Sequence, residues 1–327
     1  MTIAVVGATG LVGSLILKVL EEQNLLFDTL LPVASEKSIG KTVVYNGKQW
    51  KVISVADAIA MKPDYAIFSA GKDVSRQYAK NFTQAGTTVI DNSSAWRMDN
   101  DTPLVVPEIN AYSIENHKLI ANPNCSTIGM VMALHNLHKQ LKIKRLVIST
   151  YQSVTGSGIK GITQLQNERH GDNFVPIAYP HPIDLNIIPQ GGNFLDNGYT
   201  EEEIKLENET HKILNDNSIK ITSTVVRVPV TGGHSLSVNA EFYEPFSMEN
   251  VINILNNSEG LIVYDDIQNN LYPMPIISEH KDEVFVGRIR RDFSVENGIN
   301  LWITSDNLRK GAATNAVQIL KYLIRRA

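Results

Sequence analysis

The hydrophobic positions of the first 120 residues alternate between short apolar runs and segments with helical spacing. Residues 3–6 form an apolar run, and residues 14–23 after it place their apolar side chains on one helix face. A second helical stretch covers residues 74–85. Further apolar runs occur at residues 30–34, 65–69 and 88–90. Strands that alternate with helices at this pitch predict an α/β domain with a parallel, doubly wound sheet.

The second half of the chain alternates apolar and polar positions more regularly, which predicts a mostly antiparallel sheet. Asn297-Gly298, between two such runs, is typical of a hairpin turn. Residues 171–198 are rich in Pro and Gly, as in a long structured loop over a site or an interface. Residues 308–325 carry the apolar stripe of a terminal helix. The alternating runs are residues 146–152, 221–230, 236–243, 283–287 and 299–304.

The composition excludes several classes of protein. The chain has 327 residues, of which 43% are apolar and 20% charged, so collagen-like and disordered chains are excluded. The net charge is −4 and no basic run occurs, so nucleic-acid binding is not expected. No apolar stretch is long enough to span a membrane and no targeting segment is evident, which predicts a soluble cytoplasmic protein. The single cysteine, Cys125, fits a reducing compartment.

A glycine loop connects the first apolar run directly to the first helix. Gly7, Gly10 and Gly13 form the pattern G-x-x-G-x-x-G. Glycines there let the backbone approach a pyrophosphate, which then binds the free N–H groups of the helix N-terminus. The alternative is an ordinary turn between a strand and a helix. The place of the loop, after the first strand, favours a cofactor site in a Rossmann-type dinucleotide-binding domain.

The end of the second predicted strand indicates which dinucleotide binds. A site for NAD would place Asp or Glu there to bind the ribose 2′-hydroxyl. This chain has Ser35-Glu36-Lys37-Ser38, and two hydroxyls with a cation suit a 2′-phosphate. We therefore predict NADP as the cofactor. Glu36 is an acidic residue at this strand end, and taken alone it would favour NAD.

Cys125 lies immediately before the helical segment of residues 128–141. A cysteine at a helix N-terminus has its thiolate stabilised by the helix dipole, which makes it a nucleophile. The alternative is a buried structural cysteine. A nucleophilic cysteine also needs a general base. Among the eight histidines His234 stands out, because Gly232 and Gly233 place it in a turn between two predicted strands.

Eight motifs follow one another along the chain: GATGLVG at 7–13, NSSAWR at 92–97, VPEIN at 106–110, NPNCST at 122–127, YQSVTGSG at 151–158, EEEIKLENET at 201–210, RVPVTGGHS at 227–235 and DNLRKGAA at 306–313. With these motifs the chain resembles the aspartate-β-semialdehyde dehydrogenase family, from Met1 to the terminal helix. The order and spacing of the shared motifs make the resemblance highly specific. Asn124 stands where the related N-acetylglutamyl-phosphate reductases are expected to have Gly.

The resemblance implies the NADPH-dependent reduction of L-aspartyl 4-phosphate to L-aspartate 4-semialdehyde and phosphate. This step belongs to the biosynthesis of lysine through diaminopimelate, threonine, methionine and isoleucine. One alternative is a reductase of another acyl phosphate, such as N-acetylglutamyl phosphate. The other is a catalytically inactive nucleotide-binding paralogue, against which the presence of Cys125, Gln152, Arg227 and His234 argues.

The resemblance also implies roles for individual residues. Cys125 is similar to the acyl-accepting nucleophile, His234 to the acid/base and Gln152 to the residue that orients the acyl group. Arg227 resembles the clamp on the substrate carboxylate, and Glu202 an acid of the substrate site. The phosphate would bind to Arg97, Lys205 and Asn124. Without the resemblance, Arg227 could cap a sheet face and Glu202 with Lys205 could be a solvated i,i+3 pair.

The remaining implications concern the cofactor and the assembly. Lys37 stands where relatives usually carry Arg, which affects the strength of the NADP preference. The implied domains are a dinucleotide-binding domain of residues 1–122, completed by a helix over 307–327, and an α+β catalytic and dimerisation domain of residues 123–306. We expect a homodimer or a dimer of dimers, and no metal. The cofactor residues would be Gly7, Thr9, Gly10, Leu11, Val12, Ser35, Glu36, Lys37, Ser38, Thr155, Gly156 and Asn307.

Overall fold

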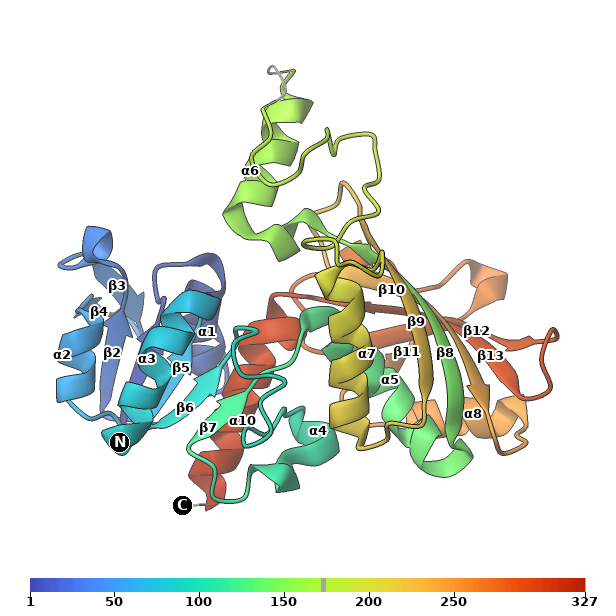
Figure 1. Cartoon of the computed structure of the whole chain (residues 1–327), viewed down its shortest axis with the longest axis horizontal. Coiled ribbons are helices and arrows are strands. Elements are labelled where there is room, and N and C mark those ends of the chain that lie inside the picture. The colour runs from blue at the N-terminus through green and yellow to red at the C-terminus, as the bar shows by residue number, and fades with distance from the viewer. Residues whose placement is uncertain (172–174, 327) are drawn as a thin grey trace. The chain divides into compact units, whose positions relative to one another are not determined.

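A computed structural model describes residues 1–171 and 175–326, and the chain divides into two compact units (Figure 1). The first unit comprises Met1–Pro123 and Ala312–Ala327, and the second comprises Asn124–Gly311. Of the loop predicted over residues 171–198, residues 172–174 lie outside the described part. No helix that the structure describes is long and apolar enough to cross a membrane.

The first unit contains a five-stranded sheet in the order β2-β1-β5-β6-β7, and every neighbouring pair of strands is parallel. The predicted parallel sheet is therefore confirmed. A separate antiparallel hairpin of β3 (Thr42–Tyr45) and β4 (Lys48–Lys51) follows β2 along the chain. The strands of the sheet are β1 (Thr2–Val6), β2 (Thr29–Val33), β5 (Tyr65–Phe68), β6 (Thr88–Asp91) and β7 (Leu119–Ala121).

Helices cover both faces of this sheet. Because successive strand residues point to opposite faces, Ile3 and Val5 of β1 join one apolar cluster, whereas Ala4 and Val6 join another. The first cluster contains residues of the N-terminal helix and of the C-terminal helix, so the chain end completes this layer. The helices of the unit are α1 (Leu11–Glu22), α2 (Val55–Ala60), α3 (Lys72–Gln84), α4 (Pro107–Asn110) and α10 (Thr314–Arg326).

The second unit contains a six-stranded mixed sheet in the order β11-β12-β13-β10-β8-β9. Its three central pairings are antiparallel, as predicted. The two edge pairings, β11 with β12 and β8 with β9, are parallel, which the alternation of residues did not indicate. The strands are β8 (Ile143–Gln152), β9 (Lys220–Arg227), β10 (His234–Phe242), β11 (Leu261–Val263), β12 (Val284–Asp292) and β13 (Gly298–Ser305).

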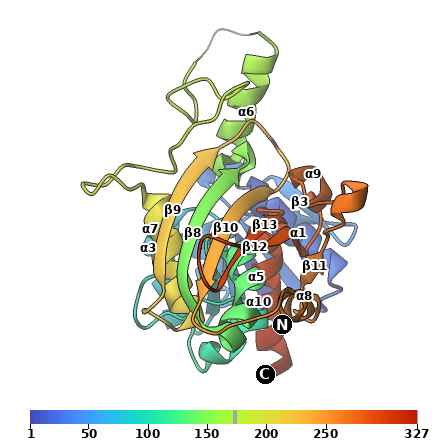
Figure 2. The same ribbon diagram turned by 90° about the vertical axis from the view of Figure 1, so that its right-hand side faces the viewer.

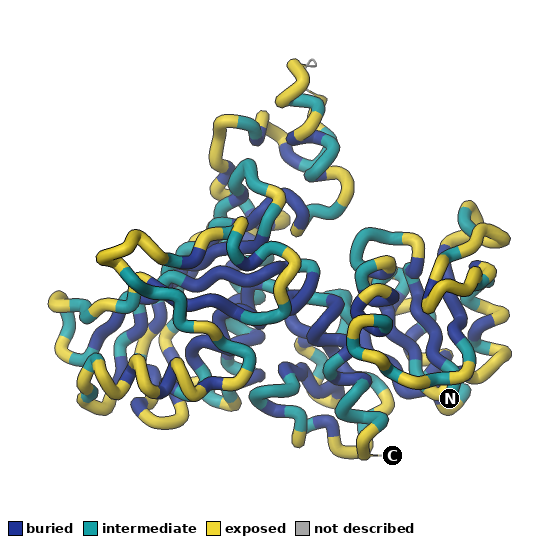
Figure 3. Tube along the Cα trace, turned by 180° about the vertical axis from the view of Figure 1, so that it is seen from behind, coloured by how far each residue is buried: buried dark blue, intermediate teal, exposed yellow. Residues whose placement is uncertain are grey.

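One face of the second sheet is covered by helices (Figure 2). Along β8 and β10, buried residues alternate with half-exposed ones, and Figure 3 shows the buried positions concentrated in the strands. Helix α6 extends beyond the end of β8 (Figure 1). The helices are α5 (Cys125–Leu141), α6 (Gly158–Arg169), α7 (Glu201–Leu214), α8 (Met248–Asn256) and α9 (Pro275–Ser278).

Several predicted elements have different bounds in the structure, and β10 already begins at His234, which was predicted to lie in the turn before it. Strand β9 ends at Arg227 instead of residue 230, because Pro229 has no N–H group for a ladder hydrogen bond. Strand β12 continues past Gly287 to Asp292 through an irregularity in its register, and its hairpin with β13 confirms the turn predicted near residue 297. The terminal helix begins with a π-helical turn over Arg309–Ala313, and α10 follows it.

The strand directions bring distant residues to one edge of the second sheet. Since β10 is antiparallel to both β8 and β13, its first residue lies beside their last residues. Gln152 is in register with Arg227 on β9, and His234 is in register with Ser305 on β13. Residues from four strands therefore meet where the predicted catalytic side chains lie.

Candidate active site

The glycine loop of the first unit is packed too closely for side chains. Gly7 has a φ of +92°, and a Cβ atom on it would lie 2.5 Å from the carbonyl oxygen of Ser69. A Cβ atom on Gly13 would lie 2.0 Å from the carbonyl oxygen of Gly7. Gly10 precedes α1 without a side-chain cap, so the N–H groups of the first turn face the loop without competition from a capping side chain. These features fit the binding of a pyrophosphate.

A cavity of about 670 Å³ adjoins this loop. Its lining includes Gly7, Thr9, Gly10, Ser35 and Glu36, five of the predicted cofactor residues. The lining also includes polar residues that no pattern in the sequence indicated, among them Ser54, Ser69, Gln77 and Tyr78. Leu11 and Val12 begin α1, and Lys37 and Ser38 belong to a short 3-10 helix after β2.

Cys125 is the first residue of α5, as predicted. The Asn124 side-chain oxygen accepts hydrogen bonds from the N–H groups of Ser126 at 2.9 Å and Thr127 at 3.4 Å, so Asn124 caps the helix. Cys125 is partly exposed, whereas Ser126 and Thr127 are fully buried. A Cβ atom on Gly311 would lie 2.7 Å from the Cβ of Cys125, so only glycine fits there.

Two glutamates of α7 hold the cap residue. The fully buried Glu209 accepts the backbone N–H of Asn124 at 2.6 Å, and Glu202 accepts from the Asn124 side-chain amide at 2.8 Å. The other oxygen of Glu202 pairs with the Lys205 ammonium at 2.5 Å. The i,i+3 pair considered from the sequence therefore exists, and it also reaches the segment that carries Cys125. Glu209 was missed, because nothing near it in the sequence indicates its partner.

Hydrogen bonds connect Gln152 to the N-terminus of α5 and His234 to Ser153, the residue after Gln152. The Gln152 amide nitrogen lies 2.9 Å from the Ser126 hydroxyl, next to Cys125. The next residue, Ser153, donates its N–H to Nδ1 of His234 at 3.1 Å. The last residue of β8 and the residue after it thus connect the helix of the nucleophile to the histidine.

The Gln152 amide has one unused position. Its oxygen Oε1 is buried and has no hydrogen-bond partner among the described residues. A half-turn of the amide exchanges the oxygen and the nitrogen. The Ser126 hydroxyl would then donate to Oε1, and Nε2 would present an N–H at the open position. Gln152 can therefore donate a hydrogen bond to the oxygen of an acyl group.

The His234 imidazole is neutral and has a defined tautomer. It is completely buried, and this desolvation, followed by the charge of Arg227, holds the pKa of His234 well below its usual value. Because Nδ1 accepts the Ser153 N–H, the ring proton belongs on Nε2. Within the described part of the chain, Nε2 has no hydrogen-bond partner. An N–H group is thus available for a substrate oxygen.

Arg227 and His234 converge on Gly156. A Cβ atom on Gly156 would lie 2.6 Å from Nη1 of Arg227 and 3.1 Å from Nε2 of His234. Beside it, the Thr155 hydroxyl lies 3.1 Å from the Asn307 side-chain oxygen. The structure therefore groups three of the predicted cofactor residues, Thr155, Gly156 and Asn307, with the predicted carboxylate clamp and the histidine.

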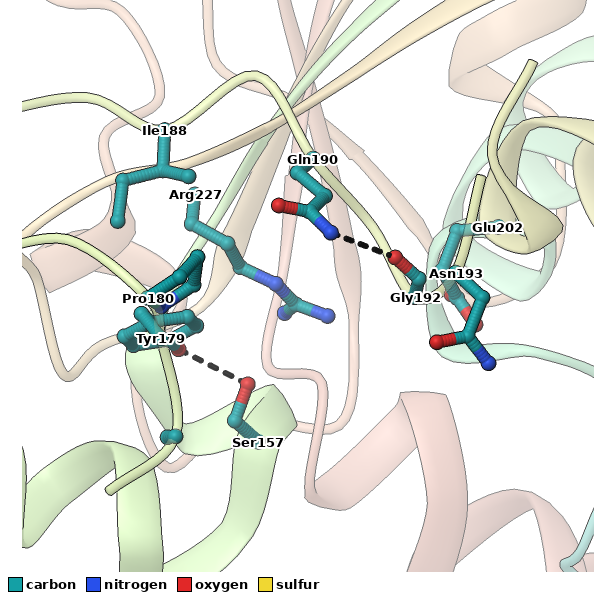
Figure 4. Close-up of a pocket in the computed structure, with 10 residues that line it drawn as sticks. Ser157, Tyr179, Pro180, Ile188, Gln190, Gly192, Asn193, Glu202 and Arg227 are labelled. Atoms are coloured by element: carbon teal, nitrogen blue, oxygen red, sulfur yellow. Dashed lines mark hydrogen bonds between the residues drawn. The ribbon is translucent and has the colours of Figure 1, made fainter. Parts of the chain in front are cut away.

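A cavity of about 380 Å³ opens next to Arg227 (Figure 4). Figure 4 shows the Arg227 guanidinium pointing into it, between Tyr179 and Ser157 on one side and Gln190 on the other. Glu202 also lines it. An arginine and a glutamate in one cavity can bind the carboxylate and the ammonium of an amino acid. The lining residues Ser157, Tyr179, Gln190 and Asn193 were not predicted individually, although three of them lie in the Pro- and Gly-rich segment.

Arg97 belongs to the first unit. Its Nε and Nη2 atoms donate to the backbone carbonyls of Asn122 and Asn92, both at 2.9 Å. The side chain is nearly buried, so these bonds fix its position. Among the residues described, no group of three or more His, Cys, Asp or Glu side chains could hold a metal ion.

Comparison with known proteins adds the family context. Two family models match, "Semialdehyde dehydrogenase, NAD binding domain" over residues 2–117 and "Semialdehyde dehydrogenase, dimerisation domain" over residues 134–310. The aspartate-semialdehyde dehydrogenase of Aquifex aeolicus is 48% identical over 99% of this chain and 98% of its own length. The aspartate-semialdehyde dehydrogenase of a Shewanella species is 43% identical over 99% of this chain and 97% of its own length. The crystal structure of aspartate semialdehyde dehydrogenase II from Vibrio cholerae complexed with ASA is 42% identical, with a TM-score of 0.95 over 99% of this chain and 98% of that chain.

Proposed function

Because the chain belongs to the aspartate-semialdehyde dehydrogenase family, we propose that it reduces L-aspartyl 4-phosphate to L-aspartate 4-semialdehyde and phosphate, with NADPH as reductant. The enzymes of this family are oxidoreductases of aspartate-pathway amino-acid biosynthesis. The observation that carries the proposal is the connection of Cys125, through Ser126 and Ser153, to Gln152 and His234. The test is nicotinamide absorbance with aspartate semialdehyde, phosphate and NADP, where no signal would contradict the proposal.

The first chemical step uses Cys125. Its sulfur reacts as the thiolate, which the N-terminus of α5 stabilises: it forms a bond to the acyl carbon of aspartyl phosphate, the bond from that carbon to the phosphate oxygen breaks, and phosphate leaves with the electron pair. The product is a thioester, with its carbonyl oxygen toward the donors of Gln152 and His234. The thiol must stay reduced to react, so we propose a cytoplasmic setting for the enzyme.

The binding of the amino-acid part is assigned to Arg227 and Glu202. Both line the cavity of Figure 4, and Arg227 is nearly buried, which strengthens its attraction for a carboxylate. Lys205, paired with Glu202, is assigned to the phosphate, and Asn124 and Arg97 are assigned to it through the resemblance. The ASA in the Vibrio cholerae structure supports the semialdehyde as the product.

The two anion sites can be separated by mutation in the phosphorylating direction. We expect Arg227→Leu to raise the KM for the semialdehyde by about 30-fold or more, since truncating one partner of a desolvated charge pair costs about 2–5 kcal/mol. We expect Lys205→Leu to raise mainly the KM for phosphate. The exposed Lys220, on β9, gives the control variant Lys220→Leu, which should leave both KM values unchanged. If Arg227→Leu weakens phosphate and spares the semialdehyde, the proposed orientation of the substrate is wrong.

The cofactor is assigned to the cavity beside the glycine loop. Gly7, Thr9 and Gly10 would hold the pyrophosphate, and Ser35 to Ser38 the adenosine ribose. When bound, NADPH would supply the hydride. We assign Thr155 and Gly156 to its nicotinamide end through the resemblance. Asn307, the other cofactor residue implied there, lies within hydrogen-bond distance of the Thr155 hydroxyl.

The preference for NADP over NAD tests the ribose site. We expect kcat/KM to favour NADP, because Ser35, Lys37 and Ser38 suit a 2′-phosphate. Lys37→Ala should narrow that preference by about tenfold, the loss of one charge-assisted hydrogen bond. Glu36 lines the cavity, so Glu36→Ala should widen the preference. Lys41 is exposed, so the control variant Lys41→Ala should leave the cofactor preference unchanged. Equal use of both cofactors by the unmodified enzyme would show that Glu36 decides the site.

A homodimer through the second unit is part of the proposal. The family model for residues 134–310 is named for dimerisation. On the sheet face away from α5, Tyr151 and Trp302 lie half-buried with ring centroids 5.3 Å apart. Aromatic side chains on an open sheet face suit a second copy of that face. Sedimentation equilibrium distinguishes a dimer from a dimer of dimers, and a monomer alone would contradict the proposal.

A further inference from the structure

The side chain of Gln164, on helix α6, binds the backbone of residues 177–179. The Gln164 oxygen accepts the backbone N–H groups of Ile177 at 3.1 Å, Ala178 at 2.8 Å and Tyr179 at 2.9 Å. Gln164 is only 1% exposed. Three consecutive residues of the segment after α6 are therefore fixed by one side-chain atom.

Glu168, one turn later on the same helix face, continues this pattern. One of its oxygens accepts the backbone N–H groups of Ile183 at 2.8 Å and Asp184 at 2.7 Å. Its other oxygen accepts from the Gln164 amide nitrogen at 2.9 Å, and that nitrogen also donates to the His181 carbonyl at 3.1 Å. The two side chains thus satisfy five N–H groups and one carbonyl of residues 177–184.

These bonds replace the secondary structure that the segment lacks. Residues 177–184 form neither a helix nor a strand, so the five N–H groups that Gln164 and Glu168 accept, which are buried or partly buried, have no ladder partners. A buried N–H group without a partner is strongly destabilising. The segment can therefore pack against α6 only while Gln164 and Glu168 accept from it.

Residues 177–184, the segment bound by Gln164 and Glu168, form one wall of the cavity beside Arg227. Ala178, Tyr179 and Pro180 line that cavity, and the Tyr179 hydroxyl donates to the Ser157 hydroxyl at 2.8 Å (Figure 4). A Cβ atom on Gly161 would lie 3.1 Å from the Tyr179 hydroxyl oxygen, so α6 approaches this contact closely. Tyr179 is 7% exposed and packs with Val154, Leu165, Ile183 and Ile188.

We propose that Gln164 and Glu168 are positioning residues for the substrate: by binding the main chain of residues 177–184 they fix Tyr179 as the wall opposite Gln190 in the cavity of Arg227. This proposal rests on the function proposed above, because it takes that cavity as the site of the amino-acid part. Neither residue touches the substrate. The expected consequence is a loss of substrate binding, with the chemical step intact.

The test replaces the acceptor with a side chain of similar size. In Gln164→Met, we expect amide hydrogen exchange at residues 177–184 to accelerate by on the order of 100-fold, since this segment opens locally. The KM for aspartate semialdehyde should rise by about tenfold or more, while kcat and the KM for phosphate change by less than about twofold. Exchange in β8 and β10 should be unchanged, which shows that the sheet is still folded.

Matched variants separate positioning from general damage. Gln166 lies on the same helix but is exposed, so Gln166→Met should behave like the unmodified enzyme. Glu168→Gln keeps one acceptor oxygen for Ile183 and Asp184 and should retain most of the affinity that Glu168→Met loses. An unchanged KM in Gln164→Met, or unchanged exchange, would overturn the proposal. If the unmodified enzyme shows no semialdehyde-dependent reduction of NADP, the proposed function fails instead, and the exchange measurement still decides whether Gln164 holds the segment.

Discussion

Replacing Cys125 by serine is expected to lower kcat by several orders of magnitude, on the order of 10³-fold or more. A thiolate attacks an acyl phosphate readily, whereas a serine hydroxyl is almost fully protonated near neutral pH. The thioester is also a better hydride acceptor than an oxygen ester. The hydrogen bonds that hold this loop use atoms of Asn124, Glu202 and Glu209, so the substitution leaves them in place.

The measurement is steady-state kcat for the Cys125→Ser variant, with NADP affinity and the thermal midpoint as controls for folding. Both controls should match the unmodified protein. Cys125 is the single cysteine of the chain, so one equivalent of iodoacetamide should inactivate the unmodified enzyme and leave the variant unlabelled. Residual turnover above about a tenth of the original rate would contradict the covalent mechanism.

The place of Cys125 could be predicted because a helix N-terminus is determined locally. Asn124 is among the residue types that cap helices best, and an apolar periodic segment follows it. The structure shows the cap at that residue. The glycine loop was predictable for the same reason, since the crowding around Gly7 and Gly13 arises within the strand, the turn and the helix that the sequence already indicated.

The residues that hold the site together could not be predicted in this way. Glu209 binds the backbone of Asn124, which is 85 positions earlier in the chain, and no local pattern in α7 indicates that contact. The segment after α6 was expected to be a structured loop over a site or an interface, but nothing in its sequence indicates that Gln164 and Glu168 bind its N–H groups. Such partners are determined by tertiary packing.

The parallel pairing of β8 with β9 has the same cause. Alternation of apolar and polar residues reports which face of a strand is buried, and it carries no information about the direction of the neighbouring strand. Here the chain passes through α6, the segment after it and α7 before it returns as β9. A crossover of this length allows the pair to be parallel, and the parallel register places Arg227 beside Gln152.

The second large effect is expected for His234→Gln. The proposed role of His234 is to donate a hydrogen bond from Nε2 to the oxygen on the acyl carbon as the thiohemiacetal forms and breaks down. One preorganised donor of this kind contributes about 10²–10³-fold, so kcat should fall by that factor. Affinity for the semialdehyde should change little, because Arg227 and Glu202 bind it. A rise in KM with an unchanged kcat would assign His234 to binding instead.

The pH dependence of the free energy of unfolding tests the lowered pKa of His234 independently of activity. Burial and the charge of Arg227 lower the pKa of His234 in the folded protein, so between that pKa and the unfolded value of about 6.5 the unfolded chain binds more protons at this residue. The free energy of unfolding therefore decreases as the pH falls below about 6.5 and continues to decrease until the folded pKa is passed. Above that window His234 is neutral in both states and contributes no pH dependence.

The thermal midpoint of the unmodified protein should therefore decrease more between pH 7 and pH 5 than that of His234→Gln. His135 and His138 also have pKa values lowered mainly by burial, but they are present in both proteins, so the difference between the two slopes isolates His234. Arg227→Leu removes the second cause of the shift and should give a slope between the two. Parallel slopes for all three proteins would mean that His234 is accessible to protons in the folded state, and its Nε2–H could not then be the constant donor that the proposed chemistry requires.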